Sequence, residues 1–337
     1  MRRHVRVTWA AVLVITLLLA RPADAWNGHG HMLVAFLAYQ QLNAAERAKA
    51  DALVQLNPLF HQWQQVILSV PTSTLPAASR SAMLFAIAAT WPDIIKTDTT
   101  HHDDGPDNGD RPPTGPSASR NTGYGDTARH KYWHFDDQPF TRDGSHLPAV
   151  PVPNAVDRIG VLRMTLASTG TSLTVRKLKS YDLVWLLHLV GDIHQPLHAA
   201  TRVGHSQPDG DHGGNLVKLV PQCATCPDEL HAFWDGILGS GDALSANPTT
   251  RNAAIASVLH TTIAVATGAA ATELNPQKWA DESLSLAKSN VYVSPIGDGA
   301  GPFTVTSAYS NAAKTTATAR IALAAARLAN ILKADLQ

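Results

Sequence analysis

The sequence predicts an all-α fold, a single-domain helical bundle over residues 26–337. Apolar residues recur with helical spacing along most of the chain, whereas the alternating pattern typical of strands is scarce. The sequence contains no internal repeat and no strong linker that would divide these residues. A chain of 337 residues is long enough to bury a sizeable core.

The first 25 residues predict a secretory signal peptide. Three arginines precede a mostly apolar run over residues 7–20, and Ala23 and Ala25 are the small residues that a cleavage site needs. That run is too short and wrongly flanked for a membrane span, and no other run approaches spanning length. We therefore expect an exported protein, periplasmic or secreted, whose mature chain begins at Trp26 and has no membrane span.

Eight stretches have the spacing expected of helices. They are residues 31–42, 44–56, 81–90, 156–167, 181–190, 249–264, 276–287 and 306–336. The stretch 181–190 is apolar on nearly every side, which marks a buried helix. Asn275 and Pro276 suit the cap and the first turn of the helix that follows them.

Two polar segments interrupt the helical pattern. Residues 97–129 are rich in Gly, Pro, Asp and Ser, so we expect a flexible loop in which His101 and His102 are solvated. Residues 201–222 include the sequence DHGGN and are expected to form a turn near the functional site.

The chain has only two cysteines, Cys223 and Cys226. In an exported protein they predict a small loop disulfide or an exposed pair. A cysteine zinc site would need two more thiolates or imidazoles close by in the sequence, and these are missing.

The charge balance excludes one class of nucleic-acid binder. The full chain has 27 basic and 27 acidic residues, and the predicted signal peptide removes more basic than acidic ones. The mature chain is therefore slightly acidic and has no basic tract. A protein that binds duplexes by neutralising phosphates with Lys and Arg is not expected.

Two histidine–aspartate pairs carry the strongest chemical signal. His188 and Asp192 are four residues apart, as are His231 and Asp235, so each pair shares one helical face and can hold one metal. One such pair is weak evidence, because a buried His is more often a hydrogen-bonded core residue. Asp192, however, lies in an otherwise apolar helix, where a carboxylate is costly unless it is paired or metal-bound. Together with further candidates, the pairs exceed what one zinc ion needs, which favours a multi-metal site and phosphate ester chemistry.

Three other residues bear on the ligand set. His198 follows Pro196, where the chain turns, and can point toward a neighbouring metal. Cleavage after Ala25 would expose the amino nitrogen of Trp26, which can chelate a metal together with its carbonyl oxygen. His194 is assigned a structural role. Imidazole and carboxylate ligands without thiolates suit zinc in a catalytic setting.

Six short motifs give the chain a family resemblance. They are WNGHGH (26–31), WPDIIK (91–96), WHFDD (133–137), HLVGDIHQPLH (188–198), GDHGGN (210–215) and LHAFWD (230–235). In this order they resemble the single-strand-specific zinc nucleases (the S-one/P-one type), which share a superfamily with the zinc-dependent phospholipases C. The phospholipase branch typically ends its last pair with Glu, so Asp235 favours the nuclease. A zinc phospholipase C and a non-catalytic zinc protein are the alternatives.

The resemblance implies an all-α fold of the zinc phospholipase C/nuclease type with three zinc ions. It assigns Asp93, His134, His188 and Asp192 to the first zinc, His198, His231 and Asp235 to the second, and Trp26, His31 and Asp192 to the third. Asp192 would bridge the first and third ions. The choice of His31 over His29 also rests on the resemblance.

The resemblance further implies hydrolysis of the bond between phosphorus and the 3′ oxygen. Single-stranded DNA or RNA and 3′-nucleotides would be the substrates, with 5′-phosphorylated products from the polymers, and no protein partner is predicted. Asp137 would orient or deprotonate the attacking water, although Asp136 competes for this role and Asp137 could instead support a ligand His. Lys96 would neutralise charge on the phosphate. Phe135 would stack on a nucleobase, with ordinary core packing as its alternative.

Overall fold

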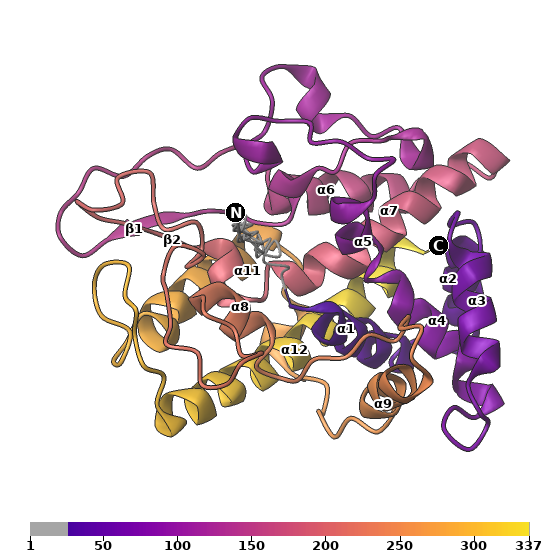
Figure 1. Ribbon diagram of the computed structural model, residues 1–337. Coiled ribbons are helices and arrows are strands. Elements are labelled where there is room, and N and C mark those ends of the chain that lie inside the picture. The colour runs from indigo at the N-terminus through magenta and orange to yellow at the C-terminus, as the bar shows by residue number, and fades with distance from the viewer. Residues whose placement is uncertain (1–25, 337) are drawn as a thin grey trace, which may run out of the picture.

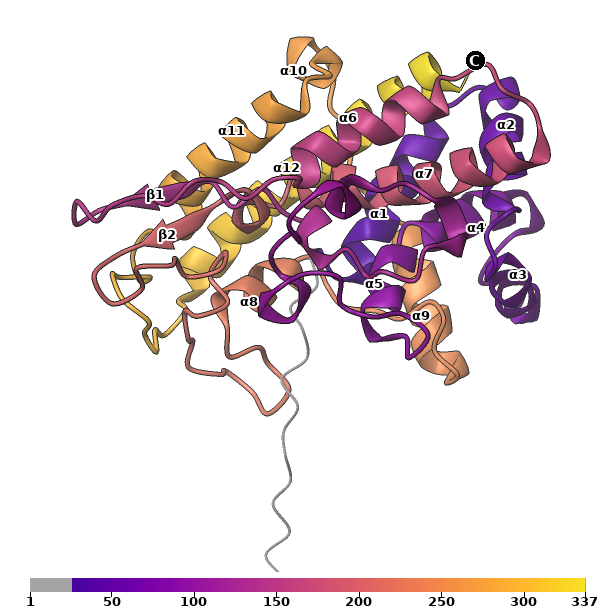
Figure 2. The same cartoon turned by 90° about the horizontal axis from the view of Figure 1, so that it is seen from above.

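The computed structural model describes residues 26–336, and the predicted signal peptide lies outside them. Within this range the chain folds into helices joined by turns, with one pair of very short strands (Figures 1 and 2). The all-α prediction is confirmed. No helix in residues 26–336 is long and apolar enough to cross a membrane.

The helices begin where polar side chains cap their first turns. Asn27 and Ser172 accept hydrogen bonds from backbone N–H groups of the helices that follow them, and Asn43 and Asn154 form reciprocal capping boxes with Glu46 and Asp157. The longer helices are α1 (Gly28–Gln40), α2 (Ala44–Val54), α3 (Phe60–Ser69), α4 (Arg80–Ala88), α6 (Ala155–Leu166), α7 (Leu173–Asp192), α9 (Pro248–Leu259), α11 (Pro276–Leu286) and α12 (Ser307–Asp335). The short ones are α5 (Trp91–Thr97), α8 (Leu230–Asp235) and α10 (Ala269–Thr272).

Two helices run through the interior. Residues 29–39 of α1 and 180–192 of α7 are buried throughout. Helix α12 packs against α1, α6 and α7, while α4 packs against α1 and α5 against α7. Helices α2 and α3 lie at one end of the molecule, on the right in both views (Figures 1 and 2). A buried helix satisfies its own backbone groups, so it can carry polar side chains into the interior at fixed positions.

The two strands join two parts of the candidate site. Strand β1 (Pro139–Thr141) pairs in parallel with β2 (Thr201–Val203), and Phe140 lies opposite Arg202. The pair extends to the side opposite α2 and α3 (Figure 1). Just before the strands, the Asp136 backbone N–H donates to the His198 carbonyl at 2.7 Å. This contact fixes the segment that carries Asp137 against the turn that carries His198.

The sequence located most helices but missed several boundaries. Helix α7 begins eight residues before the expected 181, because its first half is polar and only its buried half has the apolar signal. The stretch expected to be helical to residue 264 ends at Leu259, and the backbone N–H of Ala266 then donates to Ala322 of α12. Helices α3 and α10 were not expected.

The segment 97–129 differs from the expected flexible loop. It contains three short 3₁₀ turns, at residues 107–109, 116–119 and 123–125, and some of its acidic side chains are partly buried, whereas Asp107 and Asp110 are exposed. Asp104 and Asp126 both contact the buried ring of His130, at 2.7 and 3.2 Å. His102 is exposed as expected, but His101 is partly buried, lies edge-on to Trp91 and is 3.6 Å from an Asp98 oxygen.

Candidate metal centre

Eight of the nine predicted ligand residues form three groups, two of which share His188. The groups are His31, His188 and Asp192, then Asp93, His134 and His188, and finally His198, His231 and Asp235. Within each group, one potential ligand atom from every residue lies within 4.8 Å of the others. Residues far apart in the sequence therefore offer three positions where a metal ion could be held.

Each group is assembled from the ends of short or buried elements. His188 and Asp192 occupy the last turn of α7, and His231 and Asp235 lie on α8. Asp93 is in the first turn of α5, and His31 is in the first turn of α1. The last two histidines lie on turns: His134 follows a 3₁₀ turn at 131–133, and His198 is part of one at 196–199. Helix ends and tight turns hold these side chains without long flexible connections.

The tautomer of His188 leaves one nitrogen for a cation. Its Nδ1 lies 2.7 Å from the Ala89 carbonyl oxygen, which can only accept, so Nδ1 carries a hydrogen. Its Nε2 faces Asp192 Oδ2 at 3.2 Å, Asp93 Oδ1 at 3.4 Å and His134 Nδ1 at 2.9 Å. Burial alone would lower the pKa of His188, but the Asp192 and Asp93 carboxylates raise it to about 10. The surroundings of Nε2 therefore favour positive charge, either a proton or a metal ion.

The same arrangement recurs at His198 and His231. Nδ1 of His198 donates to the His134 carbonyl and Nδ1 of His231 to the Gly213 carbonyl, both at 2.7 Å. Their Nε2 atoms consequently face each other at 3.0 Å, and Asp235 Oδ2 lies 3.4 Å from that of His231. Burial lowers the pKa of His198 to about 4 and that of His231 to about 3, with the neighbouring His198 imidazole contributing to the second shift. Both rings are therefore neutral near pH 7, the form that binds metals.

Asp192 lies where the groups meet. Its Oδ1 is 3.2 Å from His31 Nε2, and its Oδ2 is 3.0 Å from His134 Nδ1. Burial alone would raise the pKa of Asp192, but His188 and His31 hold it well below its usual range. The residue is also at the C-terminus of α7, where the helix dipole disfavours a carboxylate. A cation at this point would offset both costs.

Two hydrogen bonds hold Trp26 beside the cluster, one from its indole and one from the backbone of Asn27. Its indole Nε1 donates to the Gly191 carbonyl at 3.0 Å, and the backbone N–H of Asn27 approaches the Asp235 carbonyl at 3.3 Å. The residue is fully buried between the ends of α7 and α8. Its role as a ligand through a free amine stays a prediction.

His29 and His194, which the sequence analysis did not choose as ligands, lie outside the three groups. His29 faces the opposite side of α1, where its Nε2 is 3.4 Å from the Ser257 hydroxyl. His194 donates from Nδ1 to the Val190 carbonyl, and Arg327 donates to its Nε2 at 2.9 Å. These contacts agree with the choice of His31 and with a structural role for His194.

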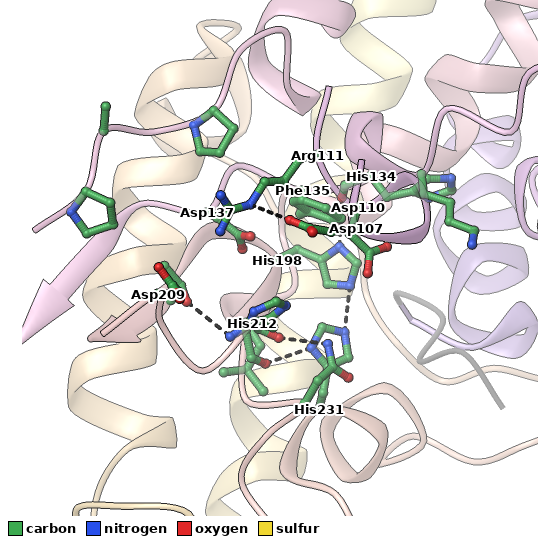
Figure 3. A pocket seen from close by; sticks show the side chains of 18 of the residues that line it. Asp107, Asp110, Arg111, His134, Phe135, Asp137, His198, Asp209, His212 and His231 are labelled. Atoms are coloured by element: carbon green, nitrogen blue, oxygen red, sulfur yellow. Dashed lines mark hydrogen bonds and ion pairs between the residues drawn. The ribbon is translucent and has the colours of Figure 1, made fainter. Parts of the chain in front are cut away.

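A pocket of about 260 Å³ opens onto the cluster (Figure 3). Among its lining residues are His134, His198 and His231, together with Lys96, Phe135 and Asp137. Burial and the negative charges of Asp211, Asp136 and Asp110 raise the pKa of Asp137 to about 8. A positive charge in the neighbouring metal groups would favour its ionised form.

Asp136 has a different environment from Asp137. Its carboxylate accepts hydrogen bonds from Asn154 at 2.6 Å and from Gln138 at 2.9 Å, and it does not line the pocket. The geometry therefore favours Asp137 over Asp136 as the carboxylate that can reach a substrate.

Lys96 and Phe135 each contact another part of the protein beside the pocket. The Lys96 ammonium lies 2.8 Å from Asp93 Oδ1, so the cation expected at the phosphate also contacts a predicted ligand. Phe135 lines the pocket on one side and packs against the hydrophobic core on the other. Both residues line the pocket.

Sequence reasoning missed several residues that support the cluster. Gln195 is fully buried and donates to Asp235 Oδ1 at 2.7 Å. Gly213, in the turn expected near the site, has φ +61°, and an added Cβ would lie 2.5 Å from the Leu197 carbonyl oxygen. This close approach lets the Gly213 carbonyl meet His231. The motifs HQPLH and GDHGGN contain both residues, but only tertiary contacts reveal what they do.

Comparison with known protein families gives a match over nearly all of the chain. A family model described as S1/P1 Nuclease matches residues 26–337, and no curated protein matches the chain.

Proposed function

The chain belongs to the S1/P1 nuclease family, and from this membership we propose that it is a zinc-dependent endonuclease and 3′-nucleotidase acting on single-stranded DNA and RNA. That it is a nuclease, a phosphodiesterase that hydrolyses nucleic acid, follows from the family. The metal, the strand preference, the 5′-phosphorylated products and the residue roles are our proposal. The observation that carries it is the opening of the Asp137 pocket onto two of the three groups of His and Asp side chains, at His134, His198 and His231.

The donor atoms fit three zinc ions. The groups offer imidazole and carboxylate ligands, and the only thiols of the chain are joined in the Cys223–Cys226 disulfide. Nε2 of His31 and Oδ1 of Asp192 are buried 3.2 Å apart, and within residues 26–336 neither atom has a well-directed hydrogen-bond partner, which fits two ligand atoms of one ion. The proposed sets are Asp93, His134, His188 and Asp192 for the first ion, His198, His231 and Asp235 for the second, and Trp26, His31 and Asp192 for the third.

Each residue of the pocket has a separate role in the proposed mechanism. Bound zinc would act as a Lewis acid and lower the pKa of the attacking water. Asp137, as a carboxylate, would orient this water and accept its proton. Lys96 would place positive charge beside the phosphate, as a point charge without the fork of Arg. Its contact with Asp93 limits how far its ammonium can move.

Preference for single strands would come from the nucleobase contact. Phe135 lies in the pocket with Pro148, Ala149 and Pro151, which offers an apolar surface beside the metal groups. Base stacking on an aromatic ring contributes about 1–3 kcal/mol and tolerates every base. A paired base cannot reach such a ring without first leaving its duplex. The phospholipase alternative gains no support from the family match.

We also propose that the enzyme is exported and acts as one domain over residues 26–337. The family match covers this whole range, and the disulfide fits an oxidising compartment. Export would remove residues 1–25 and free the amine of Trp26.

The test is the substitution Asp137→Asn in processed, zinc-loaded protein. We expect cleavage of a single-stranded oligonucleotide to fall by at least ~100-fold, because the proton acceptor is lost. Zinc content by elemental analysis should stay unchanged, because Asp137 is not a proposed ligand. Asp209→Asn is the matched control, since it removes one carboxylate from the same pocket and should leave cleavage nearly intact. Normal cleavage by Asp137→Asn would show that its assigned role is wrong.

A further inference from the structure

The wall of the pocket formed by segment 97–129 is unfavourable to a polyanion. Asp107 and Asp110 from this segment line the pocket, and Asp137 and Asp209 line it from other segments. A single-stranded substrate carries a phosphate next to the scissile one, and this flanking phosphate would meet those carboxylates. A cation of the protein on this wall would offset that repulsion.

Most basic side chains of the pocket are already engaged. The Lys96 ammonium contacts Asp93 at 2.8 Å. The Lys131 ammonium lies 2.9 Å from an Asp103 oxygen and donates to the Asn108 carbonyl at 2.8 Å. Both lysines are largely buried, so moving either would break an ion pair in a region of low dielectric. His212 also lines the pocket, but imidazole is not a permanent cation.

Arg111 differs from these lysines in its exposure. Its Nε lies 3.0 Å from Asp107 Oδ2, and the two side chains are 49% and 55% exposed. Such a surface pair contributes only about 0–1 kcal/mol, so a phosphate can compete for the guanidinium. The planar fork of Arg binds phosphate in bidentate fashion. Figure 3 shows the side chain of Arg111 near that of Asp137.

From these contacts we propose that Arg111 binds the phosphate that flanks the scissile phosphate, exchanging Asp107 for the substrate. The proposal rests on the proposed function, because it concerns a second phosphate on the same substrate. Arg111 is then a substrate-binding residue that distinguishes a polynucleotide from a substrate with a single phosphate.

The test compares two substrates in processed, zinc-loaded protein. One is a single-stranded oligothymidylate and the other is bis(p-nitrophenyl) phosphate, which has one phosphodiester and no flanking phosphate. For Arg111→Ala we expect KM for the oligonucleotide to rise roughly five- to tenfold. The effect on kcat/KM for the small diester should be clearly smaller and should come only from the charge of Arg111 acting on Asp137. The slope of log KM against log salt concentration should become smaller by about 0.7, the contribution of one single-strand phosphate contact.

Three further variants serve as comparisons. Asp107→Asn removes the competitor for the guanidinium, so KM for the oligonucleotide should stay the same or fall. Arg176→Ala removes an exposed arginine of α7 that does not line the pocket, so the kinetic constants for both substrates should stay unchanged. Arg111→Lys keeps the positive charge but lacks the planar guanidinium. Its KM for the oligonucleotide should therefore lie between those of the wild type and Arg111→Ala.

The outcomes separate this proposal from the proposed function. If wild-type protein does not cleave the oligonucleotide, the proposed function fails. If wild type cleaves it and Arg111→Ala has the same KM and salt slope, the flanking-phosphate contact is overturned. An equal loss on both substrates would also overturn it, because Arg111 would then act through Asp137 or through the fold.

Discussion

At the scale of single residues, backbone carbonyls determine which nitrogen a histidine offers. His188, His198 and His231 each donate from Nδ1 to a main-chain oxygen at 2.7 Å. The remaining nitrogen, Nε2, is thereby directed into the cluster in all three cases. Such outer contacts orient metal-binding imidazoles and raise their basicity.

Gly191 gives a sharp test of this geometry. A Cβ at this position would lie 2.9 Å from Nδ1 of His31 and 3.3 Å from its Cε1. Gly191→Ala should therefore push His31 out of place and weaken the third zinc site roughly 10–100-fold. We expect one zinc fewer per chain by elemental analysis at limiting zinc, with lower nuclease activity.

Gly160→Ala is the control for helix propensity. Gly160 lies inside α6, and no heavy atom comes within 4 Å of its added Cβ. Both substitutions replace a helical glycine with alanine, which favours the helix by about 1 kcal/mol. Gly160→Ala should therefore keep all its zinc, and a full zinc complement in Gly191→Ala would contradict the proposed position of His31.

The ligand residues show how far sequence alone could go. Four-residue spacing was enough to pair His188 with Asp192 and His231 with Asp235, because a helix repeats its face over that distance. His31, Asp93 and His134 lie on other elements, so only the family resemblance could group them. Gln195 carried no recognised signal, because its bond to Asp235 depends on how α7 and α8 pack.

At the scale of elements, sequence likewise does not show the tertiary contacts that determine where helices begin and how loops fold. The buried half of α7 could be predicted from its apolar run, whereas residues 173–180 are polar and were not. The acidic segment 97–129 resembled a solvated loop, because sequence does not show that its carboxylates meet His130, Arg129 and Lys131.

His130 connects this segment to the metal cluster. Its ring lies 3.7 Å from that of Trp133 and nearly parallel to it, and His134 follows Trp133 in the chain. Asp104 accepts from the His130 backbone at 3.0 Å and from the Tyr132 hydroxyl at 2.7 Å, in addition to its contact with the His130 ring. Burial alone would lower the pKa of His130, but Asp104 and Asp126 raise it above its ordinary value.

The substitution Asp104→Ala tests this anchor. It removes the acceptor of several partly buried hydrogen bonds and should lower the free energy of unfolding by about 2–3 kcal/mol near pH 6, measured with urea. Because the His130 pKa is raised on folding, its contribution is complete below its unfolded pKa and is lost as pH rises through the folded value. The difference in the free energy of unfolding between wild type and variant should therefore become smaller as the pH rises through the folded-state pKa of His130.

At low pH, the stability difference depends on the titration of Asp104 itself. Hydrogen bonds and the charge of His130 lower the pKa of Asp104 against the opposing effect of burial, so its contribution is lost as pH falls through that lowered value. Asp281→Ala removes an exposed aspartate and serves as the control. A stability difference that stays constant with pH would show that His130 is not charged in the folded protein.

At the scale of the whole molecule, the proposed metal ions would supply much of the attraction for nucleic acid. The full chain has no net formal charge, and the sequence has no basic tract. The cluster contains the carboxylates of Asp93, Asp192 and Asp235, which divalent cations would more than neutralise. The positive field would then be confined to the pocket where the reaction occurs.

The chain start completes the cluster in our proposal. Trp26 is fully buried, and its indole is bonded to Gly191 at the end of α7. One added residue before Trp26 would turn its amine into an amide, whose nitrogen lacks a lone pair for a metal. We expect such a protein to fold but to hold two zinc ions per chain instead of three, with most of its nuclease activity lost.

Elemental analysis and an oligonucleotide assay would measure both effects. One residue added after Gln337 is the control, because it lengthens the chain equally and leaves the proposed amine free. Three zinc ions in the N-terminally extended protein would contradict the ligand role of Trp26 while leaving the other two sites untouched. Two ions would instead mean that removal of the signal peptide creates the third metal site, so that activity arises only after export.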